Sequence, residues 1–272
     1  MPSGRIDQWE IFRDLRELGV TAGMLLIVHS SLRAIGQVVG GPQTVVEALL
    51  QAITEKGTLV IPTFSWGYLA TYDQRSTPSV IGAIPEYTRT RPDFFRSFHP
   101  THSVAAKGPL AKAITENHGA AGALAKGGPF HRVAQWGGEV LMLGCDHRSN
   151  SMVHVGEDLH GAPYRQRTPE RFTEGIGRDG QEYRFNVAGS PQCSIAFGAI
   201  ECPLREAGAV RDGRIGSARS QLISGQAIID AAMQSLQKKS DVFLCTDPSC
   251  FVCREARQTL QHSPLKAPSG PA

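Results

Sequence analysis

Apolar and polar residues follow two different periods along this chain. Strand-like apolar runs occupy residues 24–28, 57–62 and 140–144. Short continuous runs of this kind are typical of strands that are buried on both faces of a parallel sheet. Residues 7–19 instead place their apolar side chains on one helical stripe, and residues 44–53 form a second predicted helix after a glycine-proline turn. The alternation of helix and strand predicts an α/β fold.

The rest of the chain continues this alternation, and after residue 163 the pattern changes to include an antiparallel hairpin. Further helices are predicted at 84–90, 110–117, 130–136, 196–209 and 225–236, and further strands at 103–106 and 241–245. Residues 63–80 are interpreted as an excursion over a pocket, and 119–128 as a loop of small residues. Residues 171–175 and 181–187 predict an antiparallel hairpin across Asp179 and Gly180.

One domain accounts for this pattern. We expect a single α/β domain over residues 1–261, with a mostly parallel or mixed central sheet flanked by helices and with the antiparallel hairpin as an insertion. Residues 262–272 are rich in proline and small residues, and they are expected to form a disordered tail.

The composition narrows the class of protein without identifying it. Apolar residues make up 41% of the chain and charged residues 19%, as in a soluble globular protein. No apolar run approaches the roughly 20 residues that span a bilayer, and the first residues lack the apolar core of a signal peptide. We therefore expect a cytoplasmic protein that does not enter a membrane. The net charge of +3 comes without a dense run of Lys or Arg, so nucleic-acid binding is not expected.

A histidine and a glutamate three residues apart are the strongest sign of chemistry in the chain. His154 and Glu157 follow the predicted strand at 140–144, and residues at i and i+3 share one face of a helix. A carboxylate beside an imidazole fixes its tautomer and stabilises its protonated form, which is how proteins make a general base near neutral pH. Such pairs also occur on solvated helix faces. We predict a catalytic pair because reacting groups collect at the carboxyl ends of strands in open α/β sheets.

Two stretches combine small hydroxyl groups with basic or imidazole side chains. The first follows the strand at 24–28 and consists of His29, Ser30, Ser31, Leu32 and Arg33. Hydroxyls and free backbone amides at a strand-to-helix turn suit a phosphate group or a pantetheine chain, and an arginine offers phosphate a charged fork. An ordinary joint with capping serines explains the same residues equally well. The second stretch, 98–109, holds Ser103, which can face the same cleft.

Aromatic and acidic side chains gather after the second predicted strand. They are Phe64, Trp66, Tyr68 and Asp73, and Glu157 and Asp158 add carboxylates near the proposed site. Flat aromatic surface and negative charge suit a cationic or hydroxyl-rich ligand. The alternative is a minor aromatic core beneath a long loop.

The six cysteines, at positions 145, 193, 202, 245, 250 and 253, are expected to be thiols or metal ligands, because no secretory signal accompanies them. Cys250 and Cys253 form a C-x-x-C pair, which is half of a zinc site, and Cys193 is a candidate third ligand. A fourth ligand is not evident from the sequence. Buried free thiols are the alternative.

Long motifs are ordered along nearly the whole chain, from about residue 8 to residue 260. They are LLIVHSSLRAIG at 25–36, GGP followed by TVVEAL at 40–49, GTLVIPTFSW at 57–66, FHP and SVAAKGP within 98–109, GPFHR at 128–132, and His154-x-x-Glu157 after Gly144. Together they resemble the aminoglycoside N3-acetyltransferases of the antibiotic-NAT type, which are distinct from the GNAT acetyltransferases.

The resemblance implies an acetyltransferase that uses acetyl-CoA to modify the 3-amino group of the 2-deoxystreptamine ring of aminoglycoside antibiotics, and so confers resistance. It implies that His154 is the catalytic base and that Glu157 is its partner. The CoA site is implied to lie along residues 29–33, Ser103, Val104, Ala105 and Phe130. The antibiotic side is implied to hold Asp73 and the aromatic residues of 64–68. The cysteines resemble a zinc site of some relatives.

One stretch departs from the family pattern. Residues 188–192, just before Cys193, lack the acidic or histidine-containing patch that the family often carries there. The range of accepted substrates therefore stays open, and so does the identity of a fourth zinc ligand. The sequence does not distinguish a monomer from a homodimer.

Other interpretations remain open from the sequence. Cys145 ends the strand at 140–144, and it could carry the acetyl group covalently. His147, His154, Glu157 and His160 could instead be ligands of a metal-dependent hydrolase. The chain could also acetylate an amine other than an antibiotic, or bind a cationic molecule without reacting.

Overall fold

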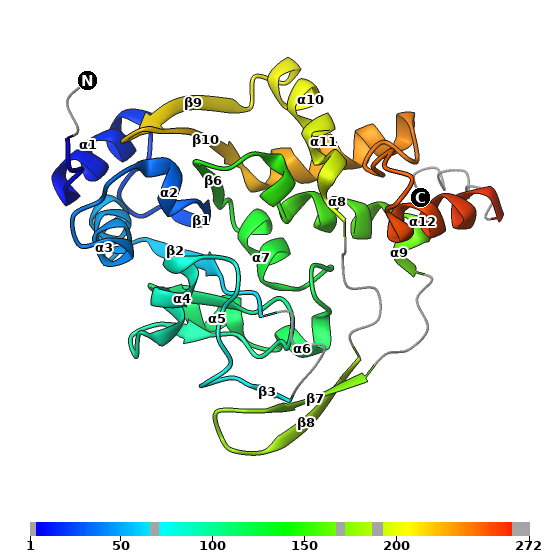
Figure 1. Cartoon of the computed structure of the whole chain (residues 1–272), viewed down its shortest axis with the longest axis horizontal. Coiled ribbons are helices and arrows are strands. Elements are labelled where there is room, and N and C mark those ends of the chain that lie inside the picture. Colours follow the sequence, from blue (N-terminus) through cyan, green and yellow to red (C-terminus); the bar gives the residue numbers. More distant parts are fainter. Residues whose placement is uncertain (1–3, 66–70, 167–171, 187–192, 263–272) are drawn as a thin grey trace.

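A seven-stranded mixed sheet forms the centre of the molecule (Figure 1). The computed structural model describes residues 4–65, 71–166, 172–186 and 193–262. In spatial order the strands are β4 (Phe95–Arg96), β5 (Val104–Lys107), β2 (Thr58–Pro62), β1 (Leu25–Ser30), β6 (Glu139–Leu143), β10 (Ala218–Ser224) and β9 (Val210–Ile215). β1 pairs in parallel with β2 and β6, and the strands outside these three pair antiparallel. The predicted α/β fold with a mixed sheet is confirmed.

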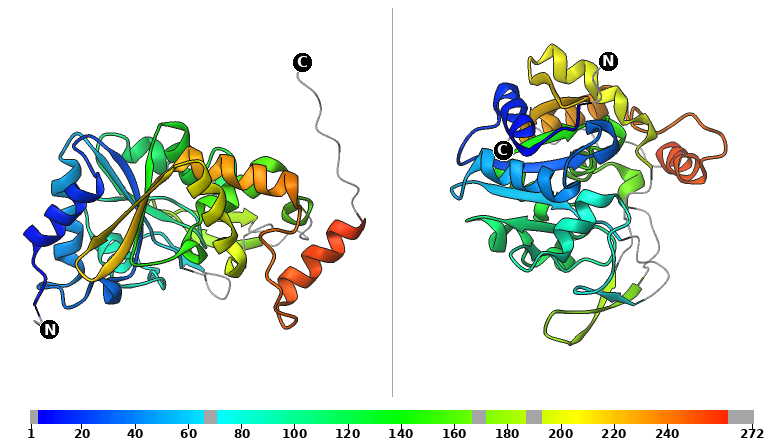
Figure 2. Two further views of the ribbon diagram at one scale, coloured as in Figure 1. Left: turned by 90° about the horizontal axis from the view of Figure 1, so that it is seen from above. Right: turned by 60° about the vertical axis from the view of Figure 1, so that its left-hand side comes forward.

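Helices cover both faces of this sheet (Figure 2). One face packs against α1 (Gln8–Leu18), α3 (Pro42–Ile53) and α4 (Ala83–Thr90), and the other against α7 (Pro129–Gln135), α8 (Met152–His160) and α11 (Gly225–Lys238). Successive residues of a strand point to opposite faces, so in β1 Leu26 and Val28 join the first core while Leu25 and Ile27 join the second. Both faces are buried, which explains the continuous apolar runs in the sequence.

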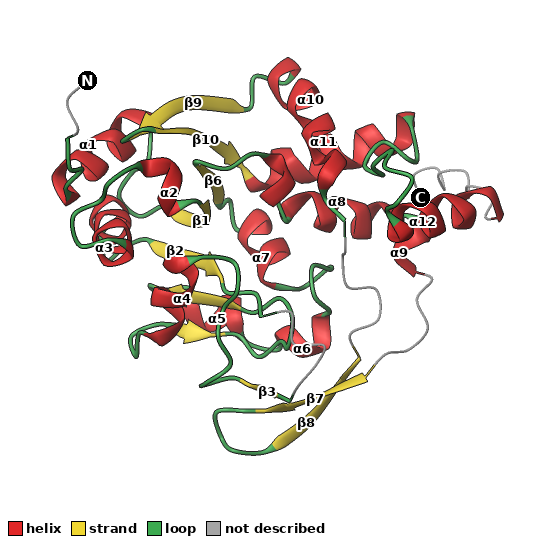
Figure 3. Cartoon of the chain, viewed as in Figure 1, coloured by secondary structure: helices red, strands yellow, loops and turns green. Residues whose placement is uncertain are grey.

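A small second sheet lies at one side of the central sheet (Figure 3) and packs on the rest of the molecule through Tyr72 and Phe185, whose rings contact Phe98. It comprises β3 (Tyr72–Asp73), β7 (Phe172–Ile176) and β8 (Glu182–Asn186). β7 and β8 form the predicted antiparallel hairpin, and β3 adds to β7 in parallel. The other helical segments are short, apart from the last: α2 (Leu32–Ile35), α5 (Ala111–Thr115), α6 (His118–Ala121), η1 (His147–Ser149), α9 (Pro163–Gln166), η2 (Ile195–Ile200), α10 (Glu201–Glu206) and α12 (Phe251–His262).

Some predicted elements differ from the structure. The strand predicted at 241–245 is wrong, because this segment is a turn whose Phe243 is buried against Phe197 with ring centroids 5.6 Å apart. The loop predicted at 119–128 begins instead inside α6. The β9–β10 hairpin was not predicted, since β9 lies at the sheet edge and carries charged residues that mask its period. α12 was not predicted either, and residues 263–272 of the expected tail lie outside the described residues.

None of the helices within the described ranges combines the length and the apolar character needed to cross a membrane.

Candidate active site

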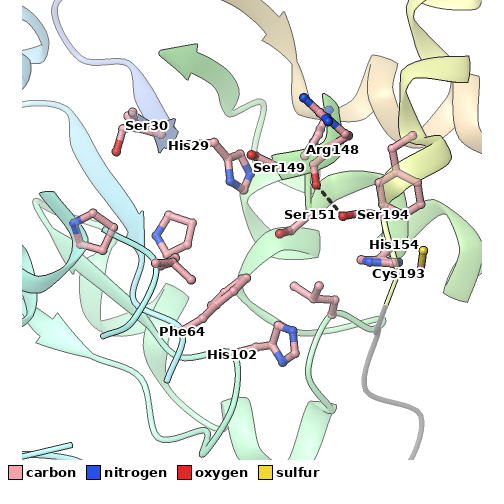
Figure 4. Close-up of a pocket in the computed structure, with 17 residues that line it drawn as sticks. His29, Ser30, Phe64, His102, Arg148, Ser149, Ser151, His154, Cys193 and Ser194 are labelled. Atoms are coloured by element: carbon pink, nitrogen blue, oxygen red, sulfur yellow. Dashed lines mark hydrogen bonds between the residues drawn. The ribbon is translucent and has the colours of Figure 1, made fainter. Parts of the chain in front are cut away.

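A cavity of about 240 Å³ opens where β1 and β6 end (Figure 4). The two strands are parallel neighbours, with Ser30 opposite Leu143, so the segments that follow them meet at one edge of the sheet. The polar lining side chains are His29, Ser30, His102, Arg148, Ser149, Asn150, Ser151, His154, Cys193 and Ser194. This is the edge at which α/β sheets place their ligands.

Two glycines allow close packing of the elements that surround this edge. Gly144 follows β6 with a φ of 69°, and a Cβ at this position would meet the Cβ of Ala34 at 2.6 Å. Gly156 lies in α8, and a Cβ there would meet the Cβ of Ala232 in α11 at 2.5 Å. A side chain at either position would clash, so glycine lets the turn after β6 approach α2 and lets α8 lie against α11.

The predicted histidine–glutamate pair is formed on α8. His154 Nδ1 and Glu157 Oε2 are 2.6 Å apart, and the two residues are only 7% and 2% exposed. The other carboxylate oxygen, Oε1, accepts a hydrogen bond of 2.8 Å from the hydroxyl of Tyr164. The ring of His154 packs edge-on against Phe197, with centroids 4.5 Å apart. Because Nδ1 is committed to Glu157, Nε2 is the nitrogen left to a substrate.

Burial sets the protonation state of His154. Removal from water lowers the pKa of His154 below 6.5, and the charge of Arg165 lowers it further, whereas Glu157 raises it through its charge and hydrogen bond. Burial is the largest of these effects. The imidazole is therefore neutral at neutral pH, which is the form that can accept a proton.

Two buried polar atoms in the cavity wall have no partner among the described residues. They are His29 Nε2 and Ser30 Oγ. Burial lowers the pKa of His29 to about 3, so its ring is neutral, and it stacks on Phe130 with centroids 6.0 Å apart. Buried polar atoms are rarely left unsatisfied without a reason, and a bound ligand would supply the missing partners.

A second hollow adjoins the cavity and shares three of its residues, Ser30, Arg148 and Ser149. It is also lined by Ser31 and Arg219. Its cationic side chains are thus Arg148 and Arg219, whereas Arg33 of the predicted phosphate segment is exposed and lines neither hollow.

The remaining predicted ligand-binding residues are distributed as follows. Phe64 lines the cavity, and Phe130 lies behind His29. Leu32 packs into the core beside α1 and α3, and Val104 and Ala105 lie in opposite cores. Ser103 is buried, and its hydroxyl donates to the carbonyl of Thr63. The carboxylate of Asp73 accepts hydrogen bonds from the backbone N–H groups of Arg75 and Ser76. The carboxylate of Asp158 accepts one from the backbone N–H of Lys126. Trp66 and Tyr68 lie outside the described residues. Their roles stay predictions.

Four cysteines converge beside α12. The Sγ atoms of Cys193, Cys245, Cys250 and Cys253 all lie within 4.8 Å of one another, and the first two are 3.7 Å apart. This brings together the three cysteines singled out in the sequence and adds Cys245 as a fourth. Cys245 was missed because the segment around it resembles a strand and is 52 residues away from Cys193.

The geometry bears on two of the open alternatives. Burial raises the pKa of Cys145 to about 12, so its thiol is rarely the thiolate that a covalent carrier needs. His147 donates to Glu201 at 2.7 Å and does not join His154. Among the described residues, the four cysteines are the only set of three or more residues placed to hold a metal ion, so the ligand set of the hydrolase hypothesis is not assembled.

Sequence reasoning missed several residues of the cavity wall. Arg148, Ser149 and Ser151 were not singled out, although they follow a predicted strand end and so carried the same signal as His29. Tyr164 had no local signal, since its hydroxyl meets Glu157 only after the chain has turned at Gly161.

Comparisons with known proteins agree with this architecture. Residues 27–237 match the family model described as aminoglycoside 3-N-acetyltransferase. Aminoglycoside N(3)-acetyltransferase VII of Streptomyces paromomycinus is 30% identical over 87% of this chain and 93% of its own length. Aminoglycoside N(3)-acetyltransferase IV of a Salmonella species is 31% identical over 86% and 89%.

A solved structure gives the same result. The crystal structure of aminoglycoside acetyltransferase AAC(3)-IVa, a histidine-to-alanine mutant in complex with a gentamicin, superposes with a TM-score of 0.85 at 29% identity. The match covers 94% of this chain and 98% of that one. The chain therefore belongs to the aminoglycoside 3-N-acetyltransferase family, whose members are acyltransferases.

Proposed function

We propose that this protein transfers the acetyl group of acetyl-CoA to the 3-amino group of the 2-deoxystreptamine ring of an aminoglycoside antibiotic. The observation that carries the proposal is the buried His154–Glu157 pair, which lines a cavity at the carboxyl ends of β1 and β6. Family membership supplies the class of reaction. The relative crystallised with a gentamicin supports an antibiotic of this class as acceptor.

His154 acts as the general base. An amine must lose a proton as it attacks, and Nε2 of the neutral imidazole accepts that proton. The new C–N bond forms and the C–S bond of the thioester breaks. The departing CoA thiolate takes up a proton from the imidazolium, so CoA leaves as its thiol and His154 returns to its neutral form. Glu157 stabilises the imidazolium that forms, because its carboxylate lies against Nδ1.

The cavity and the adjoining hollow suit acetyl-CoA. The cavity is lined by no carboxylate of the described residues, and Arg148 is its cation, so it fits an anionic co-substrate better than a polycation. His29 Nε2 and Ser30 Oγ offer hydrogen bonds to the amide groups of the pantetheine arm. Arg148 and Arg219 can pair with the phosphates, which is the role that the sequence suggested for Arg33.

The antibiotic approaches His154 from the side away from these arginines. Phe64, which lines the cavity, offers an aromatic surface to a sugar ring or an ammonium group. Asp73 and Asp158 remain proposed sources of negative charge along the approach.

The test is release of free thiol from acetyl-CoA in the presence of gentamicin, neomycin or apramycin, each against a control without amine. The control corrects for the protein's own cysteines. Thiol release, with NMR of the product locating the acetyl group on N3, is the expected result. Binding of CoA without release on any antibiotic would point to a different amine. The absence of both binding and release would refute the proposal.

The four cysteines form a proposed structural zinc site. Zinc–sulfur bonds of about 2.3 Å in a tetrahedron place the sulfurs about 3.8 Å apart, close to the spacing of Cys193 and Cys245. A bound zinc ion would hold α12 to the segment before η2. We expect elemental analysis to find about one zinc ion per chain. The thiols of the four clustered cysteines should become reactive only after a chelator has removed the metal. A metal-free protein with four reactive thiols in this cluster would contradict it.

A further inference from the structure

The carboxylate of Glu157 is held from two sides. One oxygen contacts His154 Nδ1 at 2.6 Å, and the other accepts from the Tyr164 hydroxyl at 2.8 Å. Burial raises the pKa of Tyr164, and the charge of Glu157 raises it further, so the phenol stays a hydrogen-bond donor. Tyr164 is not part of the cavity wall, so it does not line the space proposed for the substrates.

Tyr164 is seated against the C-terminal part of the chain. It belongs to α9, which packs against α12. Its side chain packs on a small buried cluster formed by Leu244, Cys245, Cys253 and Ala256. The ring therefore has the cysteine region on one side and the carboxylate of Glu157 at its tip.

We propose that Tyr164 is a positioning residue for the reaction, which keeps Glu157 directed at His154 and transmits the placement of α12 to the histidine–glutamate pair. The proposal rests on the proposed function of that pair. A carboxylate bonded through a single oxygen can rotate about its terminal torsion, which is broad. A second bond removes that freedom, so Oε2 stays in line with Nδ1. Loss of a hydrogen bond to a charged group predicts a fall of about tenfold in kcat.

Tyr164→Phe removes only the hydroxyl, and Tyr183→Phe is its matched control. Tyr183 also donates to a carboxylate, Asp179, at 2.7 Å, but on the exposed hairpin. We expect kcat of Tyr164→Phe to fall about tenfold, with KM values for acetyl-CoA and the antibiotic changed less than twofold and with the control unchanged. In a Glu157→Ala background the same change should cost less than twofold, since Tyr164 then has no carboxylate to hold. A variant that is merely misfolded would lose activity in both backgrounds.

A second readout does not depend on turnover. The short His154–Glu157 hydrogen bond should give a far-downfield proton resonance, assigned by its loss in His154→Ala. The His147–Glu201 bond of 2.7 Å provides an internal reference. Tyr164→Phe should move or broaden the first resonance and leave the second in place. If the first resonance stays unmoved, the proposal is overturned, whether or not the enzyme acetylates aminoglycosides. If it moves while wild-type protein releases no thiol, the positioning role stands and the proposed function fails.

Discussion

Glu157→Gln isolates the charge of the carboxylate beside His154. Glutamine has nearly the same shape, and its one oxygen can still accept from His154 Nδ1 while its amide faces Tyr164. The hydrogen bond is therefore kept and the negative charge is lost. A hydrogen bond to a charged group is worth about 1.5 kcal/mol more than a neutral one, which sets a loss of about tenfold in kcat as the lower bound. Coulomb's law for unit charges about 4 Å apart at an effective dielectric constant of about 20 gives about 4 kcal/mol, or about a thousandfold, as the upper bound.

The pH dependence of the rate should also shift in a defined direction in this variant. The rate falls at low pH because protonated His154 cannot accept a proton. Burial lowers the pKa of His154 and Glu157 opposes that effect, so removing the charge lowers the pKa further. Glu157→Gln should thus be slower at pH 7.5, yet its rate should persist to a lower pH than that of the wild type.

Steady-state thiol release between pH 5 and 9 measures both effects. Glu201→Gln is the matched control, because it changes the same charge beside His147, outside the 240 Å³ cavity. A kcat of Glu157→Gln within twofold of wild type, or an acidic limb displaced to higher pH, would refute the assigned role.

Three further predictions follow from buried groups. His154→Ala should lower kcat by about 10²–10⁴ and leave CoA binding intact. His160→Ala, at the end of the same helix, is the control and should keep most of the activity. A His154→Ala variant that kept a tenth of the wild-type rate would exclude His154 as the general base. Cys245→Ser should lose bound zinc and lower the melting temperature, with Cys202→Ser, exposed and outside the cluster, as control. Burial lowers the pKa of His118 to about 4 in the folded protein. As the pH falls below 6.5, this histidine is therefore protonated in the unfolded chain before it is protonated in the folded one. This effect should lower the free energy of unfolding by about 2 kcal/mol between pH 7 and pH 5. In His118→Asn the free energy of unfolding should fall less steeply over the same pH range.

The sheet was predictable where a strand is a continuous apolar run, and not at β10, whose apolar residues alternate with polar ones. β1, β2 and β6 are continuous apolar runs because helices cover them on each side. The same reasoning failed at 241–245, where the apolar residues are buried by a turn that packs under η2 and α12 rather than by a sheet. A short run of apolar residues indicates that a segment is buried. It does not by itself indicate whether that segment is a strand or a turn.

The contact between His154 and Glu157 was predictable because both residues lie on one helix. Their separation is a local property, fixed by the helical repeat. The cysteine cluster was predicted in part for the same reason, since Cys250 and Cys253 are local to each other. Cys245 and Cys193 reach them by long-range packing, which no spacing rule describes.

The sequence by itself determined the α/β class, the strands β1, β2, β5 and β6 of the central sheet, the His154–Glu157 unit and the family, because these depend on periodicity and on ordered local motifs. Only the tertiary structure decided which residues share the site. The parallel pairing of β1 with β6 brings His29 and Ser30 to the segment of Arg148, and the turn after α8 brings Tyr164 back onto Glu157. Such contacts depend on how distant segments pack, and packing is a property of the whole fold rather than of any stretch of sequence.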